Sequence, residues 1–312
     1  MNRDIARAAQ LLRAGGLVAF PTETVYGLGA DASNAQAVAR LYAVKRRPAD
    51  HPVIVHFDGA ERAFTWARDV PESARTLARR FWPGPLTLIL KRSALAKDFI
   101  TGAQDNVGVR VPAHPVAHEL LVAFGGGIAA PSANRFGLVS PTSAAHVRAD
   151  LGSDVDLVLE GGPSEVGIES TIVDLSGARP AAVLRPGRIT AAEIAAALGQ
   201  AVAEKPREAP RHSGGLERHY APRTPARLVP AFQLDREIAR LEDKVAVLAF
   251  SRPDERVDYW LRMPRDPKAY AQKLYAALRE LDGAQCEAIL IEAPPPATEW
   301  DAVLDRLRRA CE

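Results

Sequence analysis

The chain has 312 residues, of which 47% are hydrophobic and 25% charged, and its formal net charge is +2. This composition is typical of one or two ordinary globular domains, and the charge gives no reason to expect a nucleic-acid or membrane partner. Neither a signal peptide nor a transmembrane span is expected, because the N-terminus is a charged amphipathic pattern and no run of about 18 apolar residues occurs. Two cysteines without metal-like spacing, Cys286 and Cys311, indicate reduced thiols in a cytoplasmic protein.

Short apolar runs alternate with helical patterns over most of the chain. Strands are expected at 17–20, 53–57, 86–90, 107–111, 127–130, 156–160, 170–175 and 181–185. Helices are expected at 34–45, 71–81, 115–124, 142–151 and 190–198, with N-caps at Ser33, Thr142 and Thr190. Several strands between 156 and 185 follow one another without a helix. The pattern therefore predicts an α/β fold with a twisted mixed sheet rather than a strictly parallel one.

The composition changes near residue 200. Residues 205–227 contain four prolines, a Gly-Gly pair and no periodicity, which is typical of a linker. Six basic residues oppose two acidic ones there, a formal balance of +4. A smaller α/β pattern then resumes, with strands at 245–250 and 286–293 and helices at 267–282 and 298–310. We therefore expect a main domain at 1–204, a linker at 205–227 and a Rossmann-like C-terminal domain at 228–312.

Standard catalytic and metal motifs fit poorly. The stretch GLGADA (27–32) resembles a dinucleotide fingerprint, but six residues, four of them polar or aromatic, separate it from the strand ending at Phe20. No Gly-Lys pair and no G-x-S-x-G stretch occur, which excludes a P-loop and makes an α/β-hydrolase a poor fit. His114 and His118 form half a metal site at most, and no acidic metal cluster is evident. We expect no protein-held metal.

What remains is a set of hydroxyl and basic side chains at strand ends. Arg110 interrupts an apolar strand, so it must be paired or bind an anion. The turn-rich stretch APSANRFG (130–137) offers N–H groups and hydroxyls that can hold phosphate. Ser170 opens a strand and Arg185 ends one. No nucleophile accompanies a base, so the pattern favours binding of a polyanion and a small polar substrate over covalent catalysis.

Eight motifs in a fixed order carry a family resemblance: FPTETVYGLGADA, KRRPADHP, FWPGPLTLIL, GVRVP, APSANRFG, ESTIVD, LRPG and RHYAP. The chain resembles the YrdC family of threonylcarbamoyl-AMP synthases in its longer, two-domain form. The resemblance is dense over roughly 1–225, and the C-terminal domain matches mainly by position and pattern. It implies a nucleotidyltransferase that joins L-threonine, bicarbonate and ATP, for threonylcarbamoyladenosine in tRNAs that read ANN codons.

The resemblance also assigns residues, one motif at a time. It implies threonine contacts by Thr24, His56, Arg110, Ala130 (through backbone) and Ser170. It implies nucleotide contacts by Lys45, Arg47, His51, Asn106, Ser132, Asn134, Ser140, Arg185 and Tyr220. Lys45 and Arg47 resemble the family's K-x-R pair, which implies that they are the catalytic residues, acting by positioning and charge stabilisation. Glu23 is available as a general base but is expected only to shape the pocket. The glycines after it are expected to let the backbone approach the ligand.

The remaining expectations concern cofactors and partners. Mg²⁺ is expected to arrive with ATP, and no tightly bound organic cofactor is expected. A downstream threonylcarbamoyl-transferase complex would take the product, and tRNA or double-stranded RNA is retained as a weak further partner. The linker is expected to act as a lid, with Gly214 and Gly215 as hinges. The competing hypothesis is an RNA-binding or regulatory module without synthase activity, which the basic linker motivates.

Overall fold

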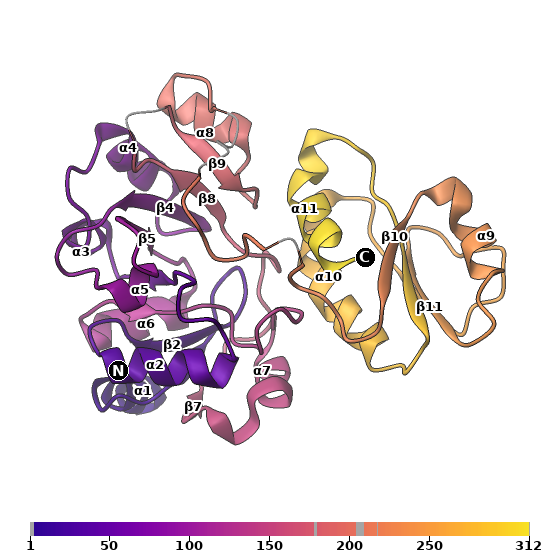
Figure 1. Ribbon diagram of the computed structural model, residues 1–312, viewed down its shortest axis with the longest axis horizontal. Coiled ribbons are helices and arrows are strands. Elements are labelled where there is room, and N and C mark those ends of the chain that lie inside the picture. Colours follow the sequence, from indigo (N-terminus) through magenta and orange to yellow (C-terminus); the bar gives the residue numbers. More distant parts are fainter. Residues whose placement is uncertain (1–2, 178–179, 204–208, 217, 312) are drawn as a thin grey trace. The chain divides into compact units, whose positions relative to one another are not determined.

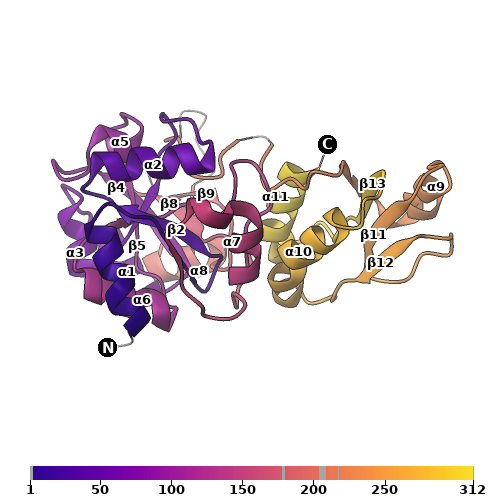
Figure 2. The ribbon, with the colours of Figure 1, turned by 90° about the horizontal axis from the view of Figure 1, so that it is seen from below.

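The computed structural model describes residues 3–177, 180–203, 209–216 and 218–311. They form two compact units, coloured by sequence in Figures 1 and 2. The larger unit comprises Met1–Phe136, Pro141–Glu165 and Glu169–Gly215, and the smaller comprises Gly137–Ser140, Val166–Ile168 and Leu216–Glu312. Glu204 and Lys205, where the linker was predicted to begin, lie outside the described residues. The described helices include none long and apolar enough to cross a membrane.

The larger unit is built on a nine-stranded sheet with the order β7-β1-β2-β6-β3-β5-β4-β8-β9. Its strands are β1 (Val18–Phe20), β2 (Gly27–Asp31), β3 (Ile54–His56), β4 (Leu86–Lys91), β5 (Asn106–Arg110), β6 (Ile128–Ala129), β7 (Leu157–Val158), β8 (Thr171–Asp174) and β9 (Ala182–Arg185). β3 pairs with β5 and β4 with β8 in parallel, whereas β4–β5 and β8–β9 are antiparallel. The predicted mixed sheet is therefore confirmed.

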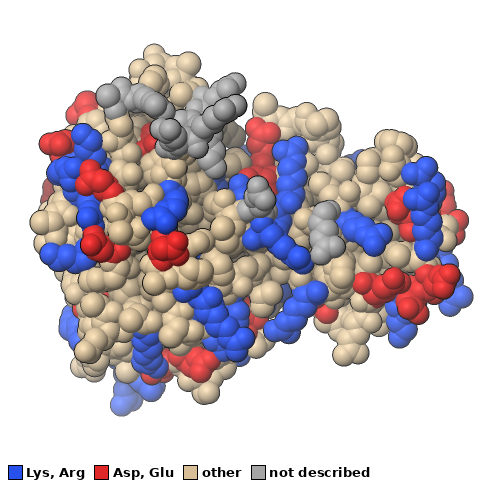
Figure 3. Space-filling view, in the orientation of Figure 1, with Lys and Arg blue, Asp and Glu red and all other residues tan. Residues whose placement is uncertain are grey.

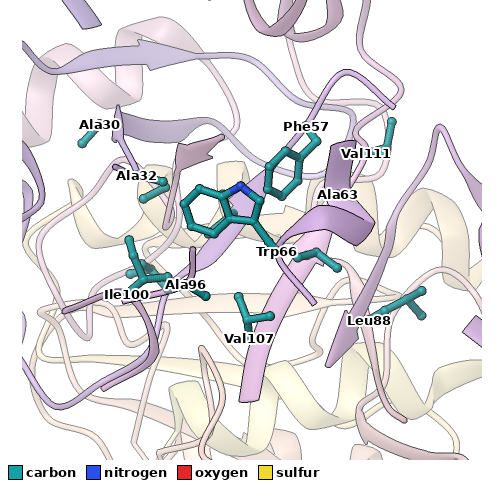
Figure 4. Close-up of a cluster of buried hydrophobic side chains, with 14 of the residues drawn as sticks. Ala30, Ala32, Phe57, Ala63, Trp66, Leu88, Ala96, Ile100, Val107 and Val111 are labelled. Atoms are coloured by element: carbon teal, nitrogen blue, oxygen red, sulfur yellow. The ribbon is translucent and has the colours of Figure 1, made fainter. Parts of the chain in front are cut away.

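Helices pack on both faces of this sheet. They are α1 (Arg3–Arg13), α2 (Ala35–Lys45), α3 (Ala60–Thr65), α4 (Glu72–Phe81), α5 (Asp98–Thr101), α6 (Pro115–Phe124), α7 (Ala144–Leu151) and α8 (Ala191–Leu198). α1 and α6 lie side by side over β1 and share an apolar cluster that includes Leu12, Phe20 and Leu120. A larger cluster around Trp66 and Phe57 fills the opposite face (Figure 4), where their rings meet edge-on at 5.6 Å.

A third, small apolar cluster lies on the sheet face that carries the site residues. It consists of Ile54, Ile89, Ile172, Ala182 and Leu184, from β3, β4, β8 and β9. Ala203 and Ala209 pack against it, so irregular chain following α8 covers this part of the sheet. The stretch from Arg211 to Ser213 continues over the same strands.

Two details of the sequence prediction were wrong. Gly27–Asp31 is strand β2, antiparallel to β1, and a side chain at Gly29 would come within 2.9 Å of both Ile128 and Phe20. Close packing inside the sheet, rather than approach to a ligand, therefore explains that glycine. Two N-caps are off by one residue, because the side chains of Asn34 and Ser143 accept backbone N–H groups at the second or third positions of α2 and α7. Thr190 is the predicted cap of α8 and forms a capping box with Glu193.

The smaller unit holds a four-stranded parallel sheet with the order β10-β13-β11-β12. Its strands are β10 (Ala226–Val229), β11 (Val245–Ala249), β12 (Tyr259–Arg262) and β13 (Ala288–Glu292). Its helices are α9 (Leu234–Ile238), α10 (Pro267–Asp282) and α11 (Asp301–Ala310). The predicted smaller α/β domain is confirmed. β10 begins inside the range 205–227 that was expected to be a linker.

Candidate active site

Polar side chains lie next to one another on neighbouring strands of the larger sheet. In the strand register, His56 of β3 lies opposite Arg110 of β5, and Arg110 lies opposite Thr87 of β4. Ser170 directly precedes β8, and its hydroxyl is 2.8 Å from that of Thr87. All four side chains are buried. With Thr24 they form what we call the strand cluster, which brings together four of the five residues predicted to contact threonine.

Arg110 is held by a buried ion pair. Its Nη2 donates to Glu23 Oε1 at 2.6 Å, and both side chains are only about 5% exposed. Its Nη1 donates to Thr24 Oγ1 at 3.0 Å, and its Nε donates to the Gly84 carbonyl at 3.4 Å. The second carboxylate oxygen of Glu23 accepts the N–H of Ala113 at 3.1 Å. The Glu23 carboxylate thus offsets the cost of burying the guanidinium charge. Glu23 therefore fixes the orientation of Arg110, beyond the pocket-shaping role that the sequence suggested.

The hydroxyl of Thr24 can offer a ligand a lone pair but not its proton. Thr22 Oγ1 donates to the Val25 carbonyl at 2.6 Å, so in its 2.8 Å contact with Thr24 Oγ1 it must accept. The Thr24 hydroxyl therefore donates a hydrogen bond to Thr22 and accepts one from Arg110. One lone pair remains, which suits a donor such as an amine or a hydroxyl.

His56 is neutral in this environment. Burial lowers its pKa from 6.5 to about 3, and the nearby Arg110 charge adds to the effect. Its ring meets Phe20 edge-on at 6.2 Å. Within the described part of the chain, its buried Nδ1 has no hydrogen-bond partner. A buried nitrogen left in this way is costly unless a ligand satisfies it, so His56 is suited to bind a substrate group.

A second group, which we call the turn cluster, surrounds the turn after β6. Lys45, the last residue of α2, donates from Nζ to the carbonyls of Ser132 and Asn134, the second at 2.6 Å. Its side chain is only 1% exposed, and burial lowers its pKa well below 10.5, helped by the charge of Arg47. The structure therefore places Lys45 as the support of the turn that presents Ser132 and Asn134. Its ammonium group faces carbonyl oxygens.

Arg47 and His51 lie beside the same turn. Arg47 donates to the Pro52 carbonyl at 2.8 Å and stacks over the Phe136 ring at 5.3 Å. His51 meets Phe136 edge-on at 5.4 Å, and burial together with the Arg47 charge lowers its pKa. Phe136 N–H in turn donates to the Lys45 carbonyl at 2.8 Å. The end of α2 and the turn are thus built as one piece, in which Arg46 adopts a left-handed φ of 54° as C-cap.

Arg185 joins the strand cluster to the chain that covers it. Its Nε and Nη2 donate to the carbonyl and hydroxyl of Ser170 at 3.0 and 3.1 Å. Its Nη1 donates to the carbonyl of Ser213 at 2.9 Å. Arg211 is fixed nearby, since its backbone N–H donates to Gln104 Oε1 at 2.7 Å and its Nη2 donates to the Gly102 carbonyl at 2.6 Å. The stretch 211–213 therefore covers this part of the sheet beside Asn106, with which it lines a small cavity.

The other predicted residues are less closely grouped. Ala130 is buried, and its N–H donates to the Ile54 carbonyl at 3.0 Å. Ser140 and Tyr220 belong to the smaller unit. There the Ser140 carbonyl accepts from Arg279 Nε at 3.3 Å, and the Tyr220 ring lies under Arg306 at 5.4 Å. Among the described residues, no group of three or more His, Cys, Asp or Glu side chains is placed to hold a metal ion.

Thr87 is the residue that sequence reasoning missed. It is fully buried on β4 and hydrogen-bonded to Ser170. The signal was available, because a single hydroxyl stands inside the apolar run LTLIL at 86–90. A buried polar side chain on the site face of a strand needs a partner, and the partner here belongs to the site.

Two family models together match nearly the whole chain. The first, described as "Telomere recombination", matches residues 10–187, and the second, described as "Threonylcarbamoyl-AMP synthase, C-terminal domain", matches residues 189–311. The threonylcarbamoyl-AMP synthase of Pyrococcus abyssi is 40% identical over 317 residues, covering 97% of this chain and 92% of that protein. That of Bacillus subtilis is 39% identical, covering 98% of this chain and 92% of that protein.

A solved structure agrees with these matches. The crystal structure of P. abyssi Sua5 complexed with L-threonine superposes with a TM-score of 0.92 at 38% identity, covering 98% of this chain and 93% of that one. Fold and sequence thus define an ATP-using nucleotidyltransferase with a YrdC-type domain and a C-terminal domain. More narrowly, the chain belongs to the family of two-domain, Sua5-type threonylcarbamoyl-AMP synthases, which serve the threonylcarbamoyladenosine modification of tRNA.

Proposed function

We propose that this chain makes threonylcarbamoyl-AMP and pyrophosphate from L-threonine, bicarbonate and ATP, with threonine in the strand cluster and the nucleotide at the turn cluster and Arg185. The observation that carries the proposal is the continuity of the two clusters. Lys45 holds the turn at Ser132 and Asn134, and two residues before that turn the N–H of Ala130 donates to Ile54, which lies on the strand that carries His56. An amino acid and a triphosphate can therefore be held side by side.

The strand cluster matches the groups of threonine. Arg110 has a planar fork with N–H groups beyond those used by Glu23, Thr24 and Gly84, and such a fork suits a carboxylate. Thr24 offers a lone pair to a donor, and His56 Nδ1 is a further polar atom for the substrate. The pocket's hydroxyl and imidazole groups would distinguish threonine from an amino acid of the same shape without a hydroxyl.

The chemistry needs positioning and charge stabilisation. The amine of threonine attacks the bicarbonate carbon, a C–O bond breaks and water leaves, and an oxygen of the resulting N-carboxylate then attacks the α-phosphorus of ATP as pyrophosphate leaves. Arg47 and Arg185 supply positive charge for the departing phosphates, and Lys45 supports the turn that binds them. Mg²⁺ enters as part of the MgATP substrate and is held chiefly by phosphate oxygens.

Pyrophosphate release tests the proposal directly. Release should require threonine and bicarbonate together, and mass spectrometry of the product should show threonylcarbamoyl-AMP. Valine should be a poor substrate, because buried groups that hydrogen-bond the threonine hydroxyl are left unpaired by a methyl group. Equal turnover of valine and threonine would overturn the assignment of the strand cluster.

The competing RNA-binding function receives less support. On the face of the larger unit that Figure 3 shows, the described Lys and Arg side chains are interspersed with Asp and Glu. Electrostatic RNA binding would show a steep salt dependence and no need for threonine. Weak binding of tRNA or double-stranded RNA and delivery of the product to a threonylcarbamoyl-transferase complex remain proposals. A cytoplasmic location is also a proposal, supported by the two free cysteines.

A further inference from the structure

Thr87 and Ser170 share one hydrogen bond between two hydroxyl groups, and this leaves a proton to place. Their oxygens are 2.8 Å apart, and both side chains are fully buried. Each hydroxyl carries one proton. Only one of the two protons can lie in the bond between them, so the other must point elsewhere. Which hydroxyl keeps the outward proton decides whether Ser170 can donate to a substrate.

The contacts of Ser170 decide the direction. Ser170 Oγ already accepts an N–H from Arg185 Nη2 at 3.1 Å, and the Ser170 carbonyl accepts Arg185 Nε at 3.0 Å. In the described part of the chain, Ser170 Oγ is the one hydrogen-bond partner of Thr87 Oγ1. Thr87 is the second residue of β4 and lies opposite Arg110 of β5, and in the described part of the chain no acceptor other than Ser170 Oγ meets its proton. A buried hydroxyl proton without an acceptor is costly, and the bound substrate can supply an acceptor to Ser170, so the arrangement that satisfies both protons has Thr87 donating to Ser170.

We propose that Thr87 is a positioning residue that turns the hydroxyl proton of Ser170 toward the substrate. Ser170 then accepts twice, from Thr87 and from the Arg185 guanidinium, and its own O–H is left to donate. Acceptance from a cation polarises the hydroxyl and strengthens its donation. The group it meets is therefore an acceptor oxygen of the bound amino acid. Thr24, in the same pocket, is instead left to accept a hydrogen bond from a donor group of the substrate.

This inference rests on the proposed function, because it takes Ser170 to be a threonine contact. It adds that Ser170 is the hydrogen-bond donor in that contact, and that Thr87 determines this direction. The two statements fail separately. If Ser170→Ala leaves threonine use unchanged, the assignment of Ser170 falls and the role of Thr87 falls with it. If Ser170→Ala impairs threonine use but loss of the Thr87 hydroxyl does not, only the present inference falls.

The test is a double-mutant cycle with matched variants at position 87. Thr87→Val keeps the β-branched shape and removes the hydroxyl, whereas Thr87→Ser keeps the hydroxyl and removes the methyl group. Thr87→Val should raise KM for threonine about fivefold to tenfold, the usual worth of one neutral hydrogen bond, with a smaller change in kcat. Thr87→Ser should stay within about twofold of the unchanged enzyme.

The Ser170→Ala background separates positioning from packing. There, Thr87→Val should change KM for threonine by less than about twofold, because the hydroxyl that it orients is gone. Equal effects of Thr87→Val in both backgrounds would overturn the proposal, as would a Thr87→Ser enzyme as impaired as Thr87→Val. Thermal unfolding of each variant checks the fold. If Thr87→Val does not fold, Thr87→Cys carries the same test, since a thiol is a weak donor of similar size.

Discussion

The strand cluster and the turn cluster hold their cations in different ways. Arg110 of the strand cluster faces a carboxylate at 2.6 Å, so its charge is cancelled inside the protein. Lys45 of the turn cluster faces the carbonyls of Ser132 and Asn134, which accept its hydrogen bonds but supply no negative charge, and burial lowers its pKa well below 10.5. A cation that is already paired with a carboxylate suits a zwitterionic amino acid, whereas the positive charge of Arg47 beside the turn suits a triphosphate. The acceptors chosen by the protein thus divide one site into two chemically different halves.

Loss of Arg110 should break this division most strongly. Arg110→Ala removes the proposed partner of threonine and also leaves Glu23 buried without its counter-charge. Losing one partner of a desolvated charge pair costs on the order of 2–5 kcal/mol. KM for threonine should therefore rise at least about thirtyfold, with a much smaller change in ATP affinity measured by calorimetry.

A paired variant separates binding from folding in that experiment. Arg110→Ala with Glu23→Gln no longer buries an unpaired carboxylate, so it should regain much of the lost thermal stability. It should not regain threonine use. Abolished ATP binding with intact threonine binding in Arg110→Ala would reverse the roles of the two clusters.

Removal of the covering chain should come next in size. A chain that ends at Glu204 lacks Arg211 and Ser213, which fix the cover to Gly102, Gln104 and Arg185. It should fold, because the strands of the larger sheet all precede that point. It should bind threonine weakly and make little product, since closure excludes water from the site. Undiminished synthesis would show that the segment is only a tether.

Proteolysis of the full chain tests the same idea without truncation. Cleavage near 207–218 should slow when ATP and threonine are both present, because a closed cover is a poor protease substrate. A cleavage rate indifferent to both ligands would contradict the lid. Residues 207, 208 and 217 lie outside the described residues, and the two compact units meet in sequence at Gly215 and Leu216. Gly214 has a φ of 76°, which suits the predicted hinge.

Loss of Lys45 should impair ATP binding rather than threonine binding, and its effect should be smaller than that of losing Arg110. Lys45→Met keeps an apolar stem in the buried slot but releases the Ser132 and Asn134 carbonyls. ATP affinity should fall about tenfold, the lower end of the cost of one hydrogen bond to a charged group, with little change in threonine affinity. Lys45→Ala should show the same direction with a larger loss of stability, because it also leaves a cavity. A threonine defect larger than the ATP defect would contradict the role of the turn.

Much of the larger domain could be predicted because its signals are local. Helix α6 has the predicted bounds and begins at Pro115, and apolar runs mark β3, β4 and β5. β2 could not be predicted, because Gly27 and Gly29 carry no strand signal and their role depends on Phe20 across the sheet. The motifs identified the site residues but not the residues with which their side chains form hydrogen bonds. That Glu23 neutralises Arg110 and that Thr87 meets Ser170 follow from strand order, which no single segment encodes.

The last prediction concerns the stability of the fold rather than substrate affinity, and it uses His56 to test the burial of the strand cluster. Its pKa is about 3 in the folded protein and 6.5 in the unfolded chain, so the unfolded state binds more protons between these values. Stability therefore rises with pH across this window and is lost as the pH falls from 6.5 toward 3. One such group contributes a slope of up to about 1.4 kcal/mol per pH unit.

His56→Gln should remove that part of the slope, measured by urea unfolding of both proteins between pH 4 and pH 7. Other titrating groups cancel in the difference between the two curves. His51→Gln is the matched control, because His51 is only partly buried and should contribute less. Parallel stability curves for His56→Gln and the unchanged protein would mean that His56 is hydrated, and that the strand cluster is open to water before any substrate binds.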